Sequence, residues 1–155
     1  FEQAGQGNDT VFANINGGGF YLYDNIETLI LQGNTPFGVG NAGDNTLTGN
    51  DIANFLLGGG GNDTLNGKLG NDVLFGEAGN DSFVFQTGTG GDVIGDFVSG
   101  QDKIDVSSYG LDFAQLQGLF VQSGNVGAIQ MTNGDVIVLH NITMSQLTAT
   151  DFIFG

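Results

Sequence analysis

Oxygen-bearing side chains return at every ninth position through the middle of the chain. Five consecutive nine-residue segments, which read GNAGDNTLT, GNDIANFLL, GGGGNDTLN, GKLGNDVLF and GEAGNDSFV, begin at Gly40, Gly49, Gly58, Gly67 and Gly76. The residues at their sixth positions are Asn45, Asn54, Asp63, Asp72 and Asp81. Carboxylate and amide oxygens, together with the backbone carbonyls of a glycine-rich turn, are the hard ligands that calcium prefers. The pattern therefore predicts a calcium-binding repeat.

The spacing also indicates which elements would position these oxygens. The eighth position of every segment is apolar, at Leu47, Leu56, Leu65, Leu74 and Phe83. A short period that no α-helix has, with glycines at fixed places, is typical of a solenoid of stacked coils. We expect each segment to form a six-residue turn and a three-residue strand, with the apolar residue pointing inward. Two segments would make one coil, so turns 18 residues apart would stack and hold a row of ions at each edge.

The composition excludes several classes of function. The 155 residues carry 17 acidic side chains and only two basic ones, Lys68 and Lys103, for a formal charge of −15. Such a surface repels nucleic acid and anionic membranes, and no segment is apolar for long enough to insert into a bilayer. Because 39% of the residues are apolar, we expect a chain that repels itself without metal and condenses when cations neutralise it. With no Cys and a single His140, we expect no enzyme in this chain.

The pattern divides the chain into three regions. Residues 1–39 are expected to form an irregular lead-in to the solenoid, with wider turns, and residues 40–85 are the regular array. Residues 86–155 are expected to form an exit loop, a β-rich cap with a short helix over 112–120 and a hairpin around 132–135, and a C-terminal tail. Since the sequence has neither an initial Met nor a signal peptide, we expect a C-terminal piece of a larger protein.

Beyond this physical pattern, the sequence resembles a known family. GGGGNDTLN at 58–66 matches every position of the G-G-x-G-x-D-x-U-x repeat of RTX (hemolysin-type) calcium-binding proteins. Residues 40–107 also resemble the C-terminal domain of serralysin-type proteases, including DVIGDFVSGQDKIDVS at 92–107. The ending NGDVIVLHNITMSQLTATDFIF is similar to the ends of RTX proteins exported by type I secretion systems, which implies that the C-terminal tail of residues 86–155 carries a secretion signal. The resemblance implies an all-β fold, a right-handed parallel β-roll with a β-rich C-terminal cap.

The resemblance also implies which residues bind calcium. In that family one turn offers the carbonyls of its second and fourth residues and its sixth side chain. The turn two segments later offers its first and third carbonyls and its sixth side chain. The first implied set is Gly59, Gly61, Asp63, Gly76, Ala78 and Asp81. A second set, which shares one carboxylate with the first, is Asn41, Gly43, Asn45, Gly58, Gly60 and Asp63. A third set, at the opposite edge, is Asn50, Ile52, Asn54, Gly67, Leu69 and Asp72.

Some positions depart from the family pattern. Asn45 and Asn54 stand where the family has Asp, so the second and third sets each lose a carboxylate and should bind calcium more weakly. Ile52 replaces a turn glycine and is expected to distort the third set. The residues that lack a regular repeat 18 positions later are Lys68, Gly70 and Asp72. Their partners would come from the exit loop, where the candidates are Asp92, Asp96 and Asp102.

The function implied by the resemblance is that of a calcium-dependent module in a secreted bacterial protein. Such a chain passes a type I secretion apparatus C-terminus first and folds outside the cell, or at its surface, when several calcium ions fill the turns. It would also support the upstream domain of the same parent chain. Two alternatives stay open, a polysaccharide-binding module and a calcium-dependent adhesion or surface-layer module. The near absence of basic residues disfavours an anionic glycan, and the uneven outward strand positions place ice binding last.

Overall fold

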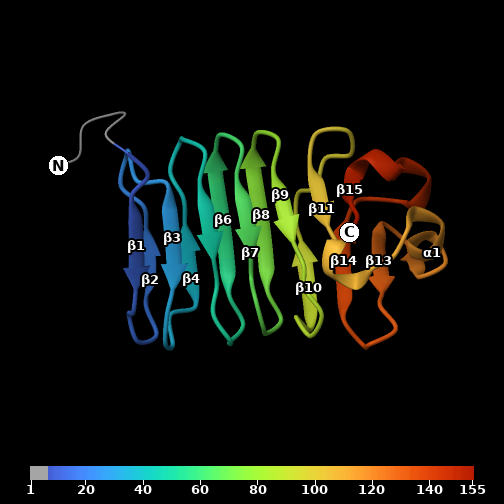
Figure 1. Ribbon diagram of the computed structural model, residues 1–155, viewed down its shortest axis with the longest axis horizontal. Coiled ribbons are helices and arrows are strands. Elements are labelled where there is room, and N and C mark those ends of the chain that lie inside the picture. Colours follow the sequence, from blue (N-terminus) through green and yellow to red (C-terminus); the bar gives the residue numbers. More distant parts are fainter. Residues whose placement is uncertain (1–6) are drawn as a thin grey trace.

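Two β-sheets face each other along the length of the molecule, and the chain visits them in turn (Figure 1). The computed structural model describes residues 7–155, so residues 1–6 of the expected lead-in lie outside the described residues. The first sheet contains, in spatial order, β1 (Thr10–Ala13), β3 (Thr28–Leu31), β5 (Thr46–Thr48), β7 (Thr64–Asn66), β9 (Ser82–Val84), β11 (Lys103–Asp105) and β15 (Phe152–Ile153). The second contains β2 (Gly19–Tyr21), β4 (Phe37–Val39), β6 (Phe55–Gly60), β8 (Val73–Ala78), β10 (Gly91–Ile94), β14 (Val136–His140), β13 (Val126–Gln130) and β12 (Phe120–Ser123). The predicted all-β roll of parallel strands is confirmed.

Strands of each sheet stack with the 18-residue offset that the repeat predicts. In the first sheet Thr46 pairs with Thr64, and Thr64 pairs with Ser82. The second sheet has the same offset across β4, β6 and β8. The lead-in follows it as well, because Thr10 pairs with Thr28 and Thr28 with Thr46. The expectation of wider turns in the lead-in is therefore wrong, since turns without the full repeat motif still complete coils of the same length.

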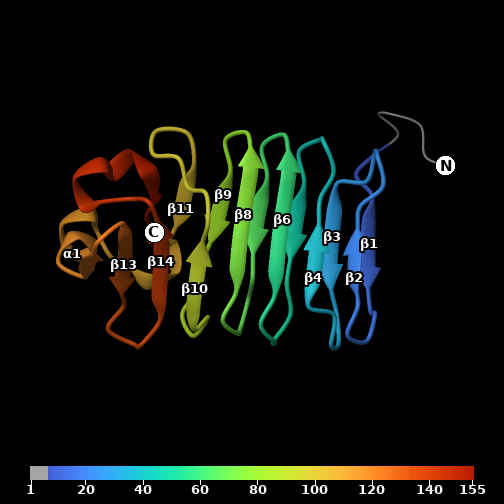
Figure 2. The ribbon, with the colours of Figure 1, turned by 180° about the vertical axis from the view of Figure 1, so that it is seen from behind.

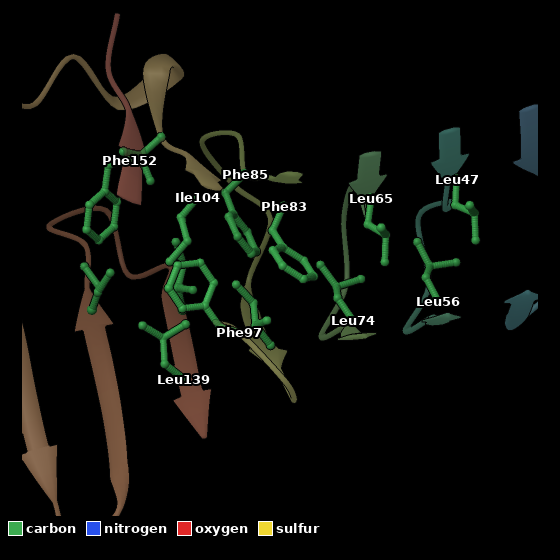
Figure 3. Close-up of a cluster of buried hydrophobic side chains, with 14 of the residues drawn as sticks. Leu47, Leu56, Leu65, Leu74, Phe83, Phe85, Phe97, Ile104, Leu139 and Phe152 are labelled. Atoms are coloured by element: carbon green, nitrogen blue, oxygen red, sulfur yellow. The ribbon is translucent and has the colours of Figure 1, made fainter. Parts of the chain in front are cut away.

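A ladder of apolar side chains fills the space between the two sheets (Figure 3). The eighth-position residues are all 0% exposed, as predicted for Leu47, Leu56, Leu65, Leu74 and Phe83. Burying a leucine side chain completely stabilises the fold by about 1.5–3 kcal/mol relative to leaving it exposed. A slip of one residue would turn this ladder outward, so the core fixes the register in which the turns stack.

The outer faces of the two sheets differ in chemistry. The first sheet carries hydroxyl side chains at its outward positions, such as Thr46 and Thr64. The second carries a row of phenylalanines on β4, β6 and β8. The ring centroids of Phe37 and Phe55 lie 6.2 Å apart, and those of Phe55 and Phe75 lie 5.5 Å apart. Over β5 and β7 the outside of the roll is therefore polar, whereas over β4, β6 and β8 it is aromatic; Phe12 on β1 is an exposed apolar residue of the first sheet.

Beyond the regular array the coil becomes longer. Val93 of β10 pairs with Val73 of β8 at an offset of 20 residues, and Ile104 of β11 pairs with Phe83 of β9 at an offset of 21. Residues 106–135 then leave the two parallel stacks and form most of the cap. Strands β14 and β15 return to extend the stacks beside β10 and β11 (Figure 2).

The cap contains the elements that the sequence predicts. Helix α1 (Phe113–Gln117) begins after Asp112, whose side chain accepts a hydrogen bond from the Gln115 N–H, which confirms the short helix. The antiparallel pairing of β13 with β14 confirms the hairpin. Three single-turn 3-10 helices complete the cap, at Ser107–Tyr109, Met144–Gln146 and Ala149–Asp151. None of the helices within residues 7–155 has the length and apolar character needed to cross a membrane.

Candidate calcium sites

The six-residue turns form two rows, one along each edge of the roll. Turns 40–45, 58–63 and 76–81 lie along the upper edge in Figure 1, and turns 49–54 and 67–72 lie along the lower edge. A turn and the next one in its row stack face to face, because their strands are neighbours in the sheets. We call the space between two stacked turns a gap. These gaps are where the repeat predicts cations.

The acidic side chains at the sixth positions reach back across the gaps. Asp63 Oδ1 accepts a hydrogen bond from the Asn45 N–H at 2.7 Å, and Asp81 Oδ1 accepts one from the Asp63 N–H at 2.8 Å. On the lower edge Asp72 Oδ1 accepts one from the Asn54 N–H at 2.7 Å. All three carboxylates are buried. Each one therefore joins its own turn to the turn 18 residues earlier through one oxygen atom.

The second oxygen of two of these carboxylates has no protein partner. Asp63 Oδ2 and Asp72 Oδ2 are buried and accept no hydrogen bond within the part of the chain that the structure describes. Leaving a buried acceptor unpaired costs about 1–3 kcal/mol, and more when the group is charged. Burial raises the pKa of Asp63 and of Asp72 to about 7, against the opposing effect of the hydrogen bonds from Asn45 and Asn54. Both sites therefore favour a positive charge beside the carboxylate.

Glycines keep the space beside these oxygens open. A Cβ atom on Gly58 would come closer than 3.0 Å to both Asp63 Oδ2 and the Gly76 carbonyl oxygen of the next turn. In the same gap, a Cβ atom on Gly79 would collide with the Gly61 carbonyl oxygen. The structure thus brings together carbonyl and carboxylate oxygens from the first predicted set. Hard oxygen atoms from two turns around one opening suit calcium, so the residues present fit this ion.

The second and third predicted sets are assembled differently. A Cβ on Gly40 would meet Asn45 Oδ1 and the Gly58 carbonyl oxygen, so these two oxygens also lie close together. Asn45 Oδ1, however, accepts a hydrogen bond from the Asn41 N–H at 2.7 Å. The Asn41 carbonyl accepts one from the Gly60 N–H at 2.9 Å. The lower edge repeats the arrangement around Gly49, where Asn54 Oδ1 lies beside the Gly67 carbonyl. Asn45 Oδ1, Asn54 Oδ1 and the Asn41 carbonyl therefore already have protein partners.

The other residues of the predicted sets also lie in the turns or at their ends. The Gly43 backbone packs against Gly61, and the Ile52 carbonyl packs against Gly70. Gly59 and Gly60 lie at the end of strand β6, where they pair with Glu77 and Ala78 at the end of β8. Two more occupy the lower turn before Gly70, namely Lys68 and Leu69.

The exit loop supplies partners to both edges rather than to one. Asp92 Oδ1 accepts the Asp72 N–H at 2.9 Å, so this candidate does face Asp72. Asp96 instead accepts the Gly76 N–H at 3.1 Å, and Asp102 accepts the Asp81 N–H at 3.0 Å. Their assignment to Asp72 is therefore corrected, because β10 runs from one edge to the other between Asp92 and Asp96.

This placement creates an acidic gap on the upper edge that sequence reasoning missed. Asp81, Asp96 and Asp102 border it, and burial raises the pKa of Asp81 and of Asp102. The length of the strand between Asp92 and Asp96 was the signal that could have separated the candidates. Within residues 7–155, no three acidic or histidine side chains gather tightly enough to form a metal cage by themselves. Backbone carbonyls would therefore supply most of the ligands in every gap.

The match to a family model agrees with this geometry. The family described as RTX calcium-binding nonapeptide repeat (4 copies) matches residues 39–56, 48–83 and 57–94. No curated protein sequence matches significantly. The extracellular lipase LipA from Serratia marcescens is similar with a TM-score of 0.54 and 13% identity, over 96% of this chain and 38% of the lipase. The AlgE6R3 subunit of the Azotobacter vinelandii mannuronan C5-epimerase has a TM-score of 0.32 and 27% identity, over 73% of this chain and 79% of that subunit.

These comparisons differ in what they support. The likeness to the lipase is one of fold, and this chain spans well under half of the lipase's length. RTX repeats bind calcium as a family property and occur in secreted bacterial proteins, and the repeat region is a structural module rather than a catalytic one. Residues 39–94 of this chain therefore match the RTX calcium-binding nonapeptide repeat, and they are folded as part of a β-roll.

Proposed function

We propose that this chain is a calcium-dependent folding module of a secreted bacterial protein, with calcium ions in the gaps beside Asp63, Asp72 and Asp81. The observation that carries the proposal is the pair of buried, unpartnered oxygens, Asp63 Oδ2 and Asp72 Oδ2. A cation would supply the missing partner and remove the charge repulsion between stacked carboxylates. Asp63 bridges its two neighbouring turns and is the central ligand.

Calcium binding and folding are coupled in this proposal. The gaps exist only when the coils are stacked, so a cation that occupies them binds the folded chain and not the unfolded one. Such a ligand stabilises the fold by an amount that grows with its free concentration. With a net charge of −15, the chain is held open by its own repulsion where calcium is scarce, and it folds where calcium is abundant.

This coupling suits export. The chain remains unfolded in the cytosol, passes a type I secretion apparatus through recognition of its C-terminal tail, and folds outside the cell. The folded roll then supports an upstream domain of the same parent chain. The fold shared with an extracellular lipase and the secreted setting of RTX repeats favour this role.

Calcium titration monitored by circular dichroism tests the proposal. We expect β-structure to grow on addition of millimolar calcium and to shrink with chelator. Asp63→Asn keeps the shape of the side chain but removes its charge, so the calcium concentration at the midpoint should rise by at least about tenfold. Asp51→Asn removes the same charge from an exposed side chain outside the sixth position and should leave the midpoint unchanged.

Two results would contradict the proposal. One is a chain that is equally folded in calcium and in chelator. The other is an equal shift of the midpoint in Asp63→Asn and Asp51→Asn, since that would indicate general charge screening instead of ligation. A fusion to an upstream domain, refolded with and without calcium, tests the role in supporting that domain.

A polysaccharide-binding role is the second candidate, and one feature favours it. The outward aromatic row of the second sheet begins with Tyr21 and Phe37, which are 69% and 48% exposed. Exposed aromatic rings provide flat apolar surfaces for neutral sugar rings. Titration of the calcium-loaded protein with neutral glycans, and then with Phe37→Ala, tests this role. Binding that survives Phe37→Ala unchanged would count against it.

A further inference from the structure

We call the gap between each row of array turns and the turn that precedes it the first gap of that row. On the upper edge a side-chain amide bridges this gap, beside an open pocket lined by residues 24–27 and 41–45. This gap lies between turn 22–27 and turn 40–45, one step before the gaps described above. Asn41 Nδ2 donates hydrogen bonds to the Tyr23 carbonyl at 2.9 Å and to the Ile26 carbonyl at 2.8 Å. Asn45 Nδ2 donates to the same Ile26 carbonyl at 3.2 Å. Tyr23 stands at the second position of its turn, one of the carbonyl positions that would face a cation in a later gap, and Ile26 stands at the fifth.

The first gap on the lower edge repeats the arrangement nine residues later. Asn50 Nδ2 donates to the Thr35 carbonyl at 2.8 Å, and Asn54 Nδ2 donates to it at 3.2 Å. Thr35 and Ile26 both stand at the fifth position of their turns. On both edges, the asparagines at the second and sixth positions of a turn donate to the fifth-position carbonyl of the preceding turn. Because the arrangement occurs twice, it is a feature of the repeat and not a chance contact.

The oxygen atoms of these second-position asparagines shape their own turns. Asn41 Oδ1 accepts the Gly43 N–H at 2.8 Å, and Asn50 Oδ1 accepts the Ile52 N–H at 3.1 Å. Neither turn contains a left-handed residue at its second or fourth position. Each of the three later turns has both, at Gly59, Gly61, Lys68, Gly70, Glu77 and Gly79. We call 40–45 and 49–54 the amide-closed turns, and 58–63, 67–72 and 76–81 the acidic turns.

We propose that the amides of Asn41 and Asn50 take the place of a cation in the first gap of each row, so that calcium in the array of residues 40–85 fills only the gaps that follow. The coils formed by residues 10–39 are then held to the array by hydrogen bonds and not by metal. This inference rests on the proposed function, because it defines where the calcium rows begin. The physical reason is that an N–H group and a cation cannot share one site. Calcium could enter only if the amide released its carbonyl partners.

The opposite end of the roll is closed without a cation as well. Asp135 accepts hydrogen bonds from the Gly88 and Gly90 N–H groups, from Asn133 Nδ2 and from the Tyr109 hydroxyl. Although burial acts to raise the pKa of Asp135, these hydrogen bonds lower it overall. On the upper edge Asp151 accepts hydrogen bonds in the same way, from the Ser99 hydroxyl and from the backbone N–H groups of residues 100 and 148. These two carboxylates at the C-terminal end of the roll therefore need no cation.

Terbium, which emits when a nearby tyrosine is excited, can report on the first upper gap, because the Tyr23 carbonyl lines it. In the otherwise unmodified protein we expect terbium emission that does not change in Tyr23→Phe. Asn41→Asp replaces the two donors with a carboxylate. We expect this variant to bind one more metal ion per chain, counted by equilibrium dialysis, and to gain emission that Tyr23→Phe removes. Asn125→Asp adds the same charge on an exposed cap turn and should add no ion.

The outcomes separate this inference from the function on which it rests. If the protein with Asn41 intact already shows emission that depends on Tyr23, the first gap binds metal and the inference is overturned. If the protein takes up no calcium or terbium at all, the proposed function fails and the inference fails with it. If Asn41→Asp does not fold, the comparison of the unmodified protein with Tyr23→Phe still decides the matter. Persistent hydrogen-exchange protection of residues 10–39 in chelator would support the inference independently.

Discussion

The amide-closed turns and the acidic turns occupy equivalent positions in one repeat, yet they satisfy their polar groups in opposite ways. In an amide-closed turn, the side-chain oxygen of Asn45 accepts a hydrogen bond from its own turn, and the side-chain N–H group of Asn45 donates one to the preceding turn. In an acidic turn, Asp63 has one oxygen bonded to the preceding turn and the other unpartnered. The difference of a single side-chain atom therefore decides whether a gap is complete by itself or requires a cation.

The backbone follows the same division. The acidic turns hold Lys68 at φ 70° and Glu77 at φ 67°, a conformation that side chains other than glycine rarely adopt. Such positions persist where the surroundings over-determine them, and they cluster at functional sites. The amide-closed turns carry no such residue at the equivalent positions, Asn41 and Asn50. The acidic turns therefore accept both an unpaired charge and backbone strain, and calcium is what would compensate for them.

The largest expected effect is a pH dependence that changes sign with calcium. Burial raises the pKa of Asp63 and of Asp72 to about 7 in the folded state, above the ordinary value of 3.8. Between these values the folded chain keeps protons that the unfolded chain releases. In metal-free buffer the free energy of unfolding should therefore fall as the pH rises from about 4 to about 7. In calcium it should rise over this range, because only the ionised carboxylates bind the ion.

Thermal melts at several pH values, with and without calcium, measure both slopes. The double substitution of Asp63→Asn and Asp72→Asn should flatten the metal-free slope, and Asp51→Asn should leave it intact. A metal-free stability that rises steadily toward neutral pH would show that these carboxylates are not held at raised pKa values.

A smaller effect is expected from placing alanine at the fourth position of each kind of turn. Gly70 has φ 125°, and a Cβ atom on it would lie 2.7 Å from the Ile52 carbonyl oxygen. Gly70→Ala should therefore destabilise the calcium-loaded protein by more than about 2 kcal/mol, from backbone strain and this collision. Ile52→Ala, at the equivalent position of the amide-closed turn, should cost less because Ile52 is only half-buried. Equal losses in denaturant unfolding would show that the two turns do not differ in conformation.

The smallest effect comes from the second positions. Lys68→Gly relieves the left-handed backbone and should stabilise the calcium-loaded protein by about 1 kcal/mol. Asn50→Gly should have the opposite sign, because it removes the hydrogen bonds to Ile52 and to the Thr35 carbonyl. Urea unfolding of the two variants in the same buffer gives the comparison. Stabilisation by both substitutions would mean that the Asn50 amide contributes nothing to the first gap.

Much of the fold could be predicted because the period acts through simple geometry. A buried side chain at every eighth position of a nine-residue unit, such as Leu65, allows only one register, and the strands stack as expected. The exit loop was less predictable. Its coils are two or three residues longer than the repeat, so sequence spacing no longer told which edge Asp92, Asp96 and Asp102 would reach.

The sequence by itself determined the stacking, the inward ladder and the presence of one oxygen-bearing side chain in each turn, because all three depend on the period alone. Only the tertiary structure decided what each oxygen does. An asparagine can be a calcium ligand or a hydrogen-bond donor, and Asn41 is a donor because the Tyr23 and Ile26 carbonyls of the preceding coil lie within reach of its amide. An aspartate has no donor when ionised, so Asp63 leaves an oxygen for a cation.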